Sequence, residues 1–206
     1  MTDYKFTQDW FHWAPEVWTQ LIPMLPGEPG KRNFLEIGSF EGRSMAWIVD
    51  NMMEGKDELY CVDTWAGGEE HGDQDMGSVE ERFDYNRSIA LTGRAVEIHK
   101  VKRTSTMQLA IMHSANVLRS EIEETAKDLD FIYIDGSHIA KDVLTDACMA
   151  WPLLKSGGIM VFDDYMWGPA RDILHRPKPA IDAFVNLFAE ELDMVHMGYQ
   201  LIVRKK

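Results

Sequence analysis

Short apolar runs that end in glycine or in an acid alternate with helix-like segments along most of the chain. The runs at 33–39, 58–65, 95–101, 129–135 and 158–164 are typical of buried strands. The segments between them carry apolar residues at helical spacing. Strands that alternate with helices predict an α/β fold in which helices cover a mostly parallel sheet.

The last part of the chain departs from this alternation. Pro179 is expected to open a final helix, because proline suits the first helical turn. The apolar stripe of this helix would consist of Ile181, Phe184, Val185, Phe188 and Leu192. Two short strand-like runs then flank Gly198 and predict a hairpin. The expected fold is therefore a Rossmann-like, doubly wound, mostly parallel seven-stranded sheet with a C-terminal antiparallel hairpin.

The beginning of the chain is unusually aromatic. Its aromatic residues include Trp10, Phe11, Trp13 and Trp18. A stretch rich in proline and glycine at 26–31 ends this part, so we expect an N-terminal helical segment over 1–30 and a main domain over 31–206. The segment could pack on the core as a cap, close over a small-molecule site as a lid, or pair subunits in a homo-oligomer.

Charge and cysteine usage narrow the partners. The formal net charge of −13 disfavours nucleic acid, and the basic stretch at 99–103 is better explained as a solvated strand edge. No apolar run is long enough to cross a membrane, and the N-terminus lacks the order of a signal peptide. Cys61 and Cys148 lie in apolar contexts, so we expect two buried, reduced thiols and a cytoplasmic location.

The first strand runs into a glycine turn that also carries an acid. Glu36, Gly38 and Gly42 form the pattern acid-x-Gly-x-x-x-Gly, which differs from the fingerprints of dinucleotide and phosphate binders. An acid in place of the first glycine suits a ligand with an ammonium group. Asp63 ends the next strand, where a carboxylate commonly accepts hydrogen bonds from ribose hydroxyls. The two motifs together favour an adenosine ligand with a free amino-acid end.

At this point the sequence resembles the class I S-adenosylmethionine-dependent methyltransferases over nearly the whole chain. The resemblance rests on FLEIGSFEGRS, LYCVDTWAGG, FIYIDGSH and LLKSGGIMVFDDY. The last two stretches are similar to small-molecule O-methyltransferases of the catechol type and of the methyltransferase-24 kind. The resemblance therefore implies methyl transfer to the hydroxyl of a small-molecule acceptor.

The resemblance also implies a role for individual residues in binding S-adenosylmethionine. The implied cofactor site consists of Glu36, Gly38, Ser39, Gly42, Asp63, Thr64, Trp65, Thr104, Ser105 and Asp135. Glu36 and Gly38 would lie at the methionine end, Asp63 would hold the ribose, and Thr104 or Ser105 would lie near the adenine. Trp65 could shield the pocket or pack in the core.

Three further carboxylates end neighbouring strands in this topology. Asp135 ends the fourth strand, and Asp163 and Asp164 end the fifth. Like charges that converge raise each other's pKa, and a divalent cation relieves the repulsion. Oxygen-only ligands favour Mg²⁺, with Mn²⁺ or Ca²⁺ as alternatives. In the catechol-type enzymes the corresponding residues bind Mg²⁺, but Asp164 stands where that family usually has asparagine.

His138 is the candidate catalytic base, with Asp135 beside it in the motif IDGSH. An imidazole titrates near neutral pH and can take a proton from a hydroxyl, whereas the catechol-type pattern has a lysine at this offset. A helix cap at residue 139 is the competing role, and His71 in the acidic loop is a second histidine that could reach the site. The alternatives for the whole protein are a metal-independent N- or O-methyltransferase, a nicotinamide-dependent oxidoreductase and a non-catalytic binding protein.

Overall fold

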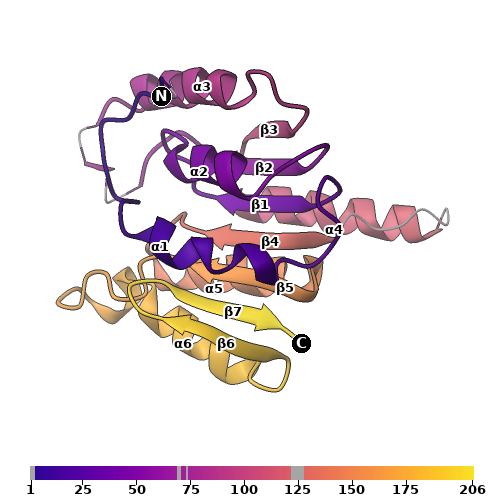
Figure 1. Ribbon diagram of the computed structural model, residues 1–206. Helices are drawn as coiled ribbons and strands as arrows, with labels where there is room; N and C mark the ends of the chain where they lie inside the picture. Colours follow the sequence, from indigo (N-terminus) through magenta and orange to yellow (C-terminus); the bar gives the residue numbers. More distant parts are fainter. Residues whose placement is uncertain (1–2, 69–70, 73, 122–127) are drawn as a thin grey trace.

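The computed structural model describes residues 3–68, 71–72, 74–121 and 128–206, and it forms one twisted sheet with helices on both faces (Figure 1). The strands are β1 (Asn33–Ile37), β2 (Glu58–Asp63), β3 (Glu97–Lys102), β4 (Leu129–Ile134), β5 (Leu154–Phe162), β6 (Leu192–Met197) and β7 (Leu201–Lys205). The helices are α1 (Ala14–Thr19), α2 (Arg43–Asn51), α3 (Met76–Ala90), α4 (Ser105–Glu121), α5 (Ala140–Ala150) and α6 (Lys178–Leu187). Short 3₁₀ helices cover Ile22–Met24, Trp151–Leu153 and Ile173–His175.

The sheet has seven strands in the order β3-β2-β1-β4-β5-β7-β6. Strands β1 to β5 pair in parallel, and β7 is antiparallel to both β5 and β6. The predicted doubly wound sheet and its C-terminal antiparallel hairpin are thus confirmed. The strand order reverses between β1 and β4, which is the point where α/β sheets bind ligands beyond the carboxyl ends of their strands.

Two separate cores hold the layers together. Helices α1, α2 and α3 cover one face of the sheet, and α4, α5 and α6 cover the other (Figure 1). Trp18 is fully buried and connects α1 to the first face, where its ring contacts Phe131 and Tyr133 of β4 and Trp47 of α2. Its Nε1 donates to Gln200 Oε1 at 2.7 Å. The aromatic N-terminal segment therefore packs on the sheet beside β4.

Three expectations need correction at the level of elements. The last helix ends at Leu187, and Leu192 opens β6 instead of extending the helical stripe. Strand β5 begins earlier than its apolar run, at Leu154. Cys61 is buried as expected, but Cys148 is exposed because it lies on the outward side of α5. A cysteine among apolar neighbours in sequence need not face the core when the segment is a helix.

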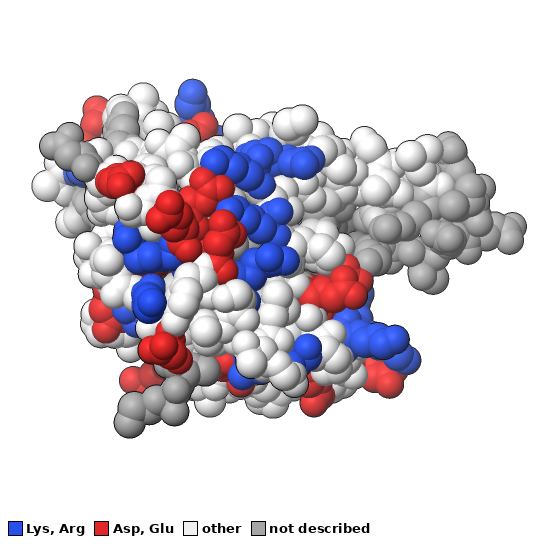
Figure 2. Space-filling model, turned by 90° about the horizontal axis from the view of Figure 1, so that it is seen from above, with Lys and Arg blue, Asp and Glu red and all other residues white. Residues whose placement is uncertain are grey.

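The basic stretch at 99–103 lies on the edge strand β3, as expected. Lys100 pairs with Glu80 and Asp84 of α3 at 2.8 and 2.7 Å, and Lys102 pairs with Glu80 at 2.5 Å. Figure 2 shows the molecule from its α3 side, where basic and acidic side chains lie next to one another. The strand's cations are therefore largely matched by acids of the neighbouring helix. Within the described residues, no helix has the length and apolar character needed to cross a membrane.

Candidate active site

A cavity of about 1080 Å³ lies at the carboxyl ends of the parallel strands. Backbone hydrogen bonds align these strand ends: Gly38 N donates to Val62 O, Asp135 N to Ile37 O and Asp163 N to Ile134 O, at 2.8 to 2.9 Å. The predicted site residues that line the cavity are Gly38, Ser39, Asp63, Thr64, His71, Thr104, Ser105, Asp135, His138, Asp163 and Asp164. Three predicted cofactor residues, Glu36, Gly42 and Trp65, are not among the described residues that line it.

Gly38 is where two strand ends approach most closely. Its φ is +85°, and a Cβ at this position would lie 1.9 Å from the carbonyl oxygen of Asp135. Only glycine fits such a contact. Gly42 has φ +78° and precedes α2, and a Cβ there would lie 2.6 Å from Met45 Cε. The first glycine thus shapes the cavity floor, whereas the second allows the helix to pack.

Asp63 organises the glycine turn through its carboxylate. Its Oδ2 accepts from the backbone N–H groups of Ser39 and Phe40, both at 2.9 Å, and its Oδ1 accepts from Trp65 N at 2.7 Å. The carboxylate still borders the cavity. Trp65 turns away, with its side chain buried against Phe83 and its Nε1 donating to Phe40 O at 2.9 Å. The core-packing alternative for Trp65 is therefore the one found.

Glu36 lies behind the turn and not on the cavity wall. Its side chain is fully buried, and its two oxygens accept from Ser44 Oγ at 2.5 Å and Ser39 Oγ at 2.6 Å. Burial raises the pKa of this carboxyl to about 7, although the two hydroxyls oppose the shift. Because this side chain is buried behind Ser39 and Ser44, the structure gives it a role in holding the glycine turn. A contact between Glu36 and a ligand's ammonium group stays a prediction.

The adenine end predicted at Thr104 and Ser105 has a partner that sequence reasoning missed. Asp146 of α5 lines the cavity beside these residues, and Ser105 hydrogen-bonds to its carboxyl group. Burial raises the pKa of Asp146 to about 6. A signal was present, because Asp146 occupies the same helical face as Val143 and Ala147, which are buried.

Three carboxylates converge at the ends of β4 and β5. The hydroxyl of Tyr133 hydrogen-bonds to Asp135 Oδ2 at 2.8 Å and to Asp163 Oδ2. Asp163 Oδ1 accepts from Asp164 N at 2.9 Å. Burial and the charge of Asp164 raise the pKa of Asp163 to about 7, and burial with the charges of Asp163 and Asp164 raises the pKa of Asp135 well above its usual range.

His138 faces this cluster and does not cap α5. Its Nε2 lies 2.6 Å from Asp164 Oδ2, and its ring packs against Trp167 with centroids 4.2 Å apart. Tyr199 donates to Asp164 Oδ1 at 2.8 Å. Asp164 itself adopts φ +57°, a left-handed conformation that turns its carboxylate toward the histidine. Tyr199 reaches the site from the hairpin, which no local sequence motif indicated.

The donor atoms closest to one another differ from the predicted ligand set. Oxygens of Asp135 and Asp164 and a nitrogen of His138 lie within 4.8 Å of one another, in a group that could hold a metal ion. Asp163 is not part of that group, since its oxygens face Tyr133 and the backbone of Asp164. Asp135 and Asp164 are thus common to the predicted and the observed groups, and the third donor is open between Asp163 and His138.

The N-terminal segment covers one side of the cavity. Gln8 to Trp13 contribute to its wall, and Trp10 contacts Phe40 of the glycine turn with centroids 5.2 Å apart. Phe40 in turn stacks on His71 at 5.2 Å. The segment is fixed by Glu41, whose carboxylate accepts from Thr7 N at 2.7 Å and Thr7 Oγ1 at 2.6 Å. Capping of the core and covering of the site are therefore combined in one segment.

Comparison with known proteins agrees with this architecture. The sequence profile of the Methyltransf_24 family, described as a methyltransferase domain, matches residues 35–165. The chain belongs to this family. Its sequence and fold are those of a class I S-adenosylmethionine-dependent methyltransferase, as the four motifs predicted. The matched range includes the glycine turn, Asp63, His138 and the carboxylates that end β4 and β5.

A curated relative and several solved structures are also similar to this chain. Uncharacterized protein R132 of Acanthamoeba polyphaga mimivirus is 29% identical over 143 residues, which cover 66% of this chain but only 54% of the viral protein. A putative rRNA-methylase from Clostridium thermocellum has a TM-score of 0.61 at 12% identity, with 94% of this chain and 97% of that one covered. The O-methyltransferase TomG from Streptomyces achromogenes has a TM-score of 0.58 at 18% identity, with 94% and 80% covered. These structural matches support the fold.

Proposed function

We propose that this methyltransferase transfers the methyl group of S-adenosylmethionine to a hydroxyl of a small-molecule acceptor, with a divalent metal at the carboxylate cluster. The observation that carries the proposal is the convergence of Asp135, Asp163, Asp164 and His138 on the cavity beside the Gly38 turn. The proposal is supported by two similar structures of low identity, TomG, an O-methyltransferase in complex with SAM, and MycE, a methyltransferase in complex with Mg and SAH.

The cofactor would lie along the half of the cavity formed by β1, β2 and β3. Gly38 and Ser39 allow close approach at the methionine end, and Asp63 presents a carboxylate edge to the ribose. Thr104, Ser105 and Asp146 offer polar atoms at the far side, where the adenine would lie. A volume of about 1080 Å³ is at the upper end for ligand sites and leaves room for an acceptor.

The metal would be held by Asp135 and Asp164 with Asp163 or His138 as the third ligand. The donors present fit a divalent cation, because crowded carboxylates on a buried wall lose their mutual repulsion when it binds. When bound, such a metal lowers the pKa of an acceptor hydroxyl and orients its oxygen. Mg²⁺ suits an oxygen-only set, whereas a set with His138 would also suit Mn²⁺.

The chain's own residues would supply proton transfer and alignment. With Asp163 as the third metal ligand, His138 would take the acceptor's proton on Nδ1, because its Nε2 already faces Asp164 Oδ2 at 2.6 Å. The Asp164 carboxylate would then stabilise the imidazolium that results. Tyr199 fixes the other oxygen of Asp164. Trp10, Trp13 and Trp167 form apolar walls that hold a planar or apolar acceptor and exclude water. Positioning of the nucleophile in line with the methyl group supplies much of the rate.

Charge supports a small acceptor over a nucleic acid. The net charge is −13, and the lysines of β3 are paired with acids of α3 (Figure 2). A net negative charge opposes the binding of a phosphate backbone. An amine acceptor is the second candidate, and it would need neither three carboxylates nor a metal.

The test is calorimetric titration of Mg²⁺ into EDTA-treated protein saturated with S-adenosylhomocysteine. We expect binding to the wild type and to Asp193→Asn, an exposed acid on β6 that serves as the matched control. Binding should be lost in Asp135→Asn. Comparison of Asp163→Asn with His138→Gln then identifies the third ligand, because only the true ligand weakens Mg²⁺ affinity when replaced.

The opposite results are equally informative. If S-adenosylhomocysteine binds but Mg²⁺ does not, the methyltransferase is metal-independent, and amine acceptors move ahead of hydroxyls. If S-adenosylhomocysteine itself does not bind, the cofactor assignment is wrong. A screen of diols, phenols and amines for release of S-adenosylhomocysteine from S-adenosylmethionine then names the acceptor class.

A further inference from the structure

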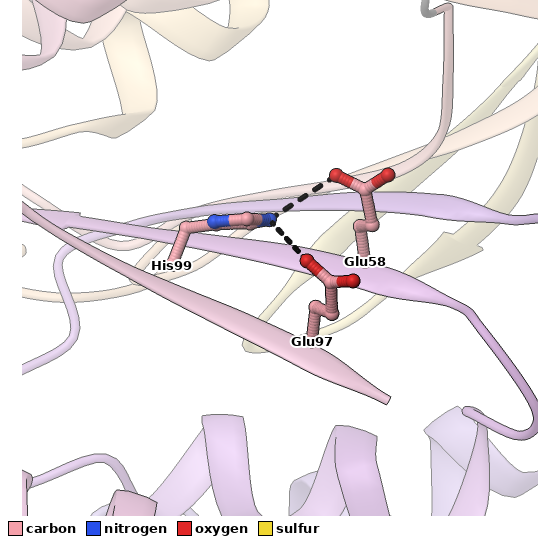
Figure 3. A group of neighbouring side chains, drawn as sticks. All are labelled: Glu58, Glu97 and His99. Carbon is pink, nitrogen blue, oxygen red and sulfur yellow. Dashed lines mark hydrogen bonds and ion pairs between the residues drawn. The ribbon is translucent and has the colours of Figure 1, made fainter. Parts of the chain in front are cut away.

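A second group of metal-type donors lies at the opposite end of the strands from the cavity. Glu58 is the first residue of β2, Glu97 is the first residue of β3, and His99 follows on β3. Figure 3 shows the His99 ring nitrogen turned toward the carboxylates of both glutamates. None of the three borders the cavity. The proposed methyl transfer therefore gives these residues no task.

The distances leave room for a shared cation, although the contact between His99 and Glu58 is also within hydrogen-bond range. His99 Nε2 lies 3.1 Å from Glu58 Oε2 and 3.8 Å from Glu97 Oε2. A tetrahedral ion with ligands at about 2.0–2.1 Å places its ligand atoms roughly 3.3–3.4 Å apart. The two distances lie on either side of this value. One ring nitrogen carries at most one proton, so it can bond to only one of the two carboxylates.

Tyr60 of β2 orients the ring of His99. The two rings are stacked with centroids 4.5 Å apart, and Tyr60 Oη donates to Glu58 Oε2 at 2.8 Å. One residue thus fixes both the ring plane of His99 and an oxygen of Glu58. Outer partners of this kind hold metal ligands in place in known sites, and they are conserved for that purpose. The donors are therefore organised before any ion arrives.

The register of the sheet forces the two glutamates together. Glu58 and Glu97 are direct partners in the parallel pairing of β2 with β3, as are Tyr60 and His99. All four side chains consequently project from the same face of the sheet. Two adjacent carboxylates repel each other unless a positive charge lies between them. Glu97 is largely exposed, so an ion and its remaining water ligands have access to the group.

We propose that Glu58, Glu97 and His99 form a binding site for Zn²⁺ or a similar late divalent metal that ties the edge strand β3 to β2. One imidazole nitrogen and two carboxylate oxygens are a zinc-type ligand set, with water completing a tetrahedral site. Mg²⁺ is disfavoured here because it demands octahedral oxygen coordination. The site is separate from the carboxylate cluster of the cavity and does not depend on the function proposed for it.

The test is a zinc titration of the full chain, with bound metal counted after removal of excess ion. We compare the wild type with His99→Gln and with His196→Gln, which removes a half-buried histidine from β6, the other edge strand. The wild type and His196→Gln should bind one more zinc equivalent than His99→Gln. Any zinc held by the cavity carboxylates appears equally in all three proteins and cancels in the comparison.

A second measurement covers the possibility that one variant changes the fold. Zn²⁺ should raise the melting temperature of the wild type by a few degrees, because an ion that binds only the folded state stabilises it. Glu97→Gln changes only an exposed side chain and should reduce the zinc affinity about tenfold or more. The proposal would be overturned if the wild type and His99→Gln bound the same number of zinc equivalents. It would also be overturned if zinc raised the melting temperature of both proteins equally, or of neither.

Discussion

Carboxylates lie in both halves of the sheet's carboxyl edge, but they are hydrogen-bonded differently at the ends of β1 and β2 than at the ends of β4 and β5. At the ends of β1 and β2, the protein itself satisfies the carboxylates. Asp63 accepts from three backbone N–H groups, and Glu36 accepts from two serine hydroxyls. At the ends of β4 and β5, the Tyr133 hydroxyl is shared by Asp135 and Asp163. Asp163 accepts one further backbone N–H, and Asp164 contacts Tyr199 and His138, so three adjacent carboxylates share few donors.

This difference indicates in which half the carboxylates are satisfied by the protein alone. A carboxylate that accepts several N–H or O–H groups is stable in place and shapes the backbone around it. Carboxylates that face one another with few donors raise each other's pKa and favour the arrival of a cation. The protein's own hydrogen bonds therefore organise the β1–β2 half, whereas we propose that a bound cation completes the β4–β5 half.

A side chain at position 38 would force the two halves of the carboxyl edge apart. Gly38→Ala places a Cβ about where the Asp135 carbonyl oxygen now lies, at 1.9 Å, on a residue with φ +85°. We expect a loss of more than about 4 kcal/mol in the free energy of unfolding, measured by urea denaturation. Gly93→Ala is the control, since it has φ +72° but no atom within 4 Å, and should cost only about 1 kcal/mol of strain. Similar losses in both would mean that strain alone matters.

The next largest effect should separate proton transfer from cofactor binding. His138→Gln and Asp164→Asn should each lower kcat by about 10²–10³, because general-base assistance contributes rate factors of this size. Affinity for S-adenosylhomocysteine, measured by calorimetry, should stay within about twofold because it depends on the other half. The double variant should be no slower than the slower single one if the pair acts as a unit. A large loss of cofactor affinity would show that the two halves are not separable.

A smaller effect should appear in the pH dependence of stability. Glu36 and Asp163 each have a folded pKa of about 7, raised from the usual carboxyl range by burial. The folded state then binds more protons than the unfolded state between pH 4 and 7, so stability falls as pH rises through this window. Each group should remove about 2–3 kcal/mol between pH 5 and 8.

The two halves should differ in how a metal changes that slope. Glu36→Gln should flatten the fall in stability whether or not Mg²⁺ is present, because Glu36 is enclosed by Ser39 and Ser44. Asp163→Asn should flatten it only in EDTA, because a bound cation would already hold the cluster ionised. Thermal unfolding from pH 5 to 8, with and without Mg²⁺, measures both. If Mg²⁺ left the pH dependence of stability unchanged in every variant, a metal at the cluster would be contradicted.

The sequence was a good guide to the sheet and to which strand ends carry acids. Apolar runs of the right length predicted β1, β2, β4 and the apolar part of β5, because a strand covered on both faces has little tolerance for polar residues. The edge strand β3 and the hairpin were predicted from shorter strand-like runs. Family resemblance then placed the strand ends beside one another. The positions of Asp135, Asp163 and Asp164 could be predicted in this way, because the residue at which a strand ends can be recognised in the local sequence.

The direction in which each side chain points could not be predicted from the sequence. Glu36 faces the core and Trp65 packs on Phe83, because their orientation depends on the pleat of the strand and on the turn that follows. Asp163 is engaged by Tyr133, whereas Asp164 swings to His138 through a left-handed backbone conformation. These orientations depend on packing between segments far apart in the chain. The contact of Tyr199 in the hairpin with Asp164 is a further example.

The smallest expected effect concerns the N-terminal segment, which borders both halves. Trp10 is 54% exposed, rests on Phe40 and lines the cavity, so it covers the cavity without filling the core. Trp10→Ala should raise the KM for an acceptor that the wild type methylates by about 2–10-fold, in line with about 0.5–1.5 kcal/mol for an aromatic contact. Its kcat and its affinity for S-adenosylhomocysteine should stay near wild type.

Leu187→Ala on α6 is the control, because Leu187 is a more exposed apolar residue that is not part of the cavity wall. It should change neither the KM for the acceptor nor kcat. An unchanged KM in Trp10→Ala would reduce the segment to a cap on the core, whereas a fall in kcat with KM unchanged would mean that Trp10 aligns the acceptor for reaction.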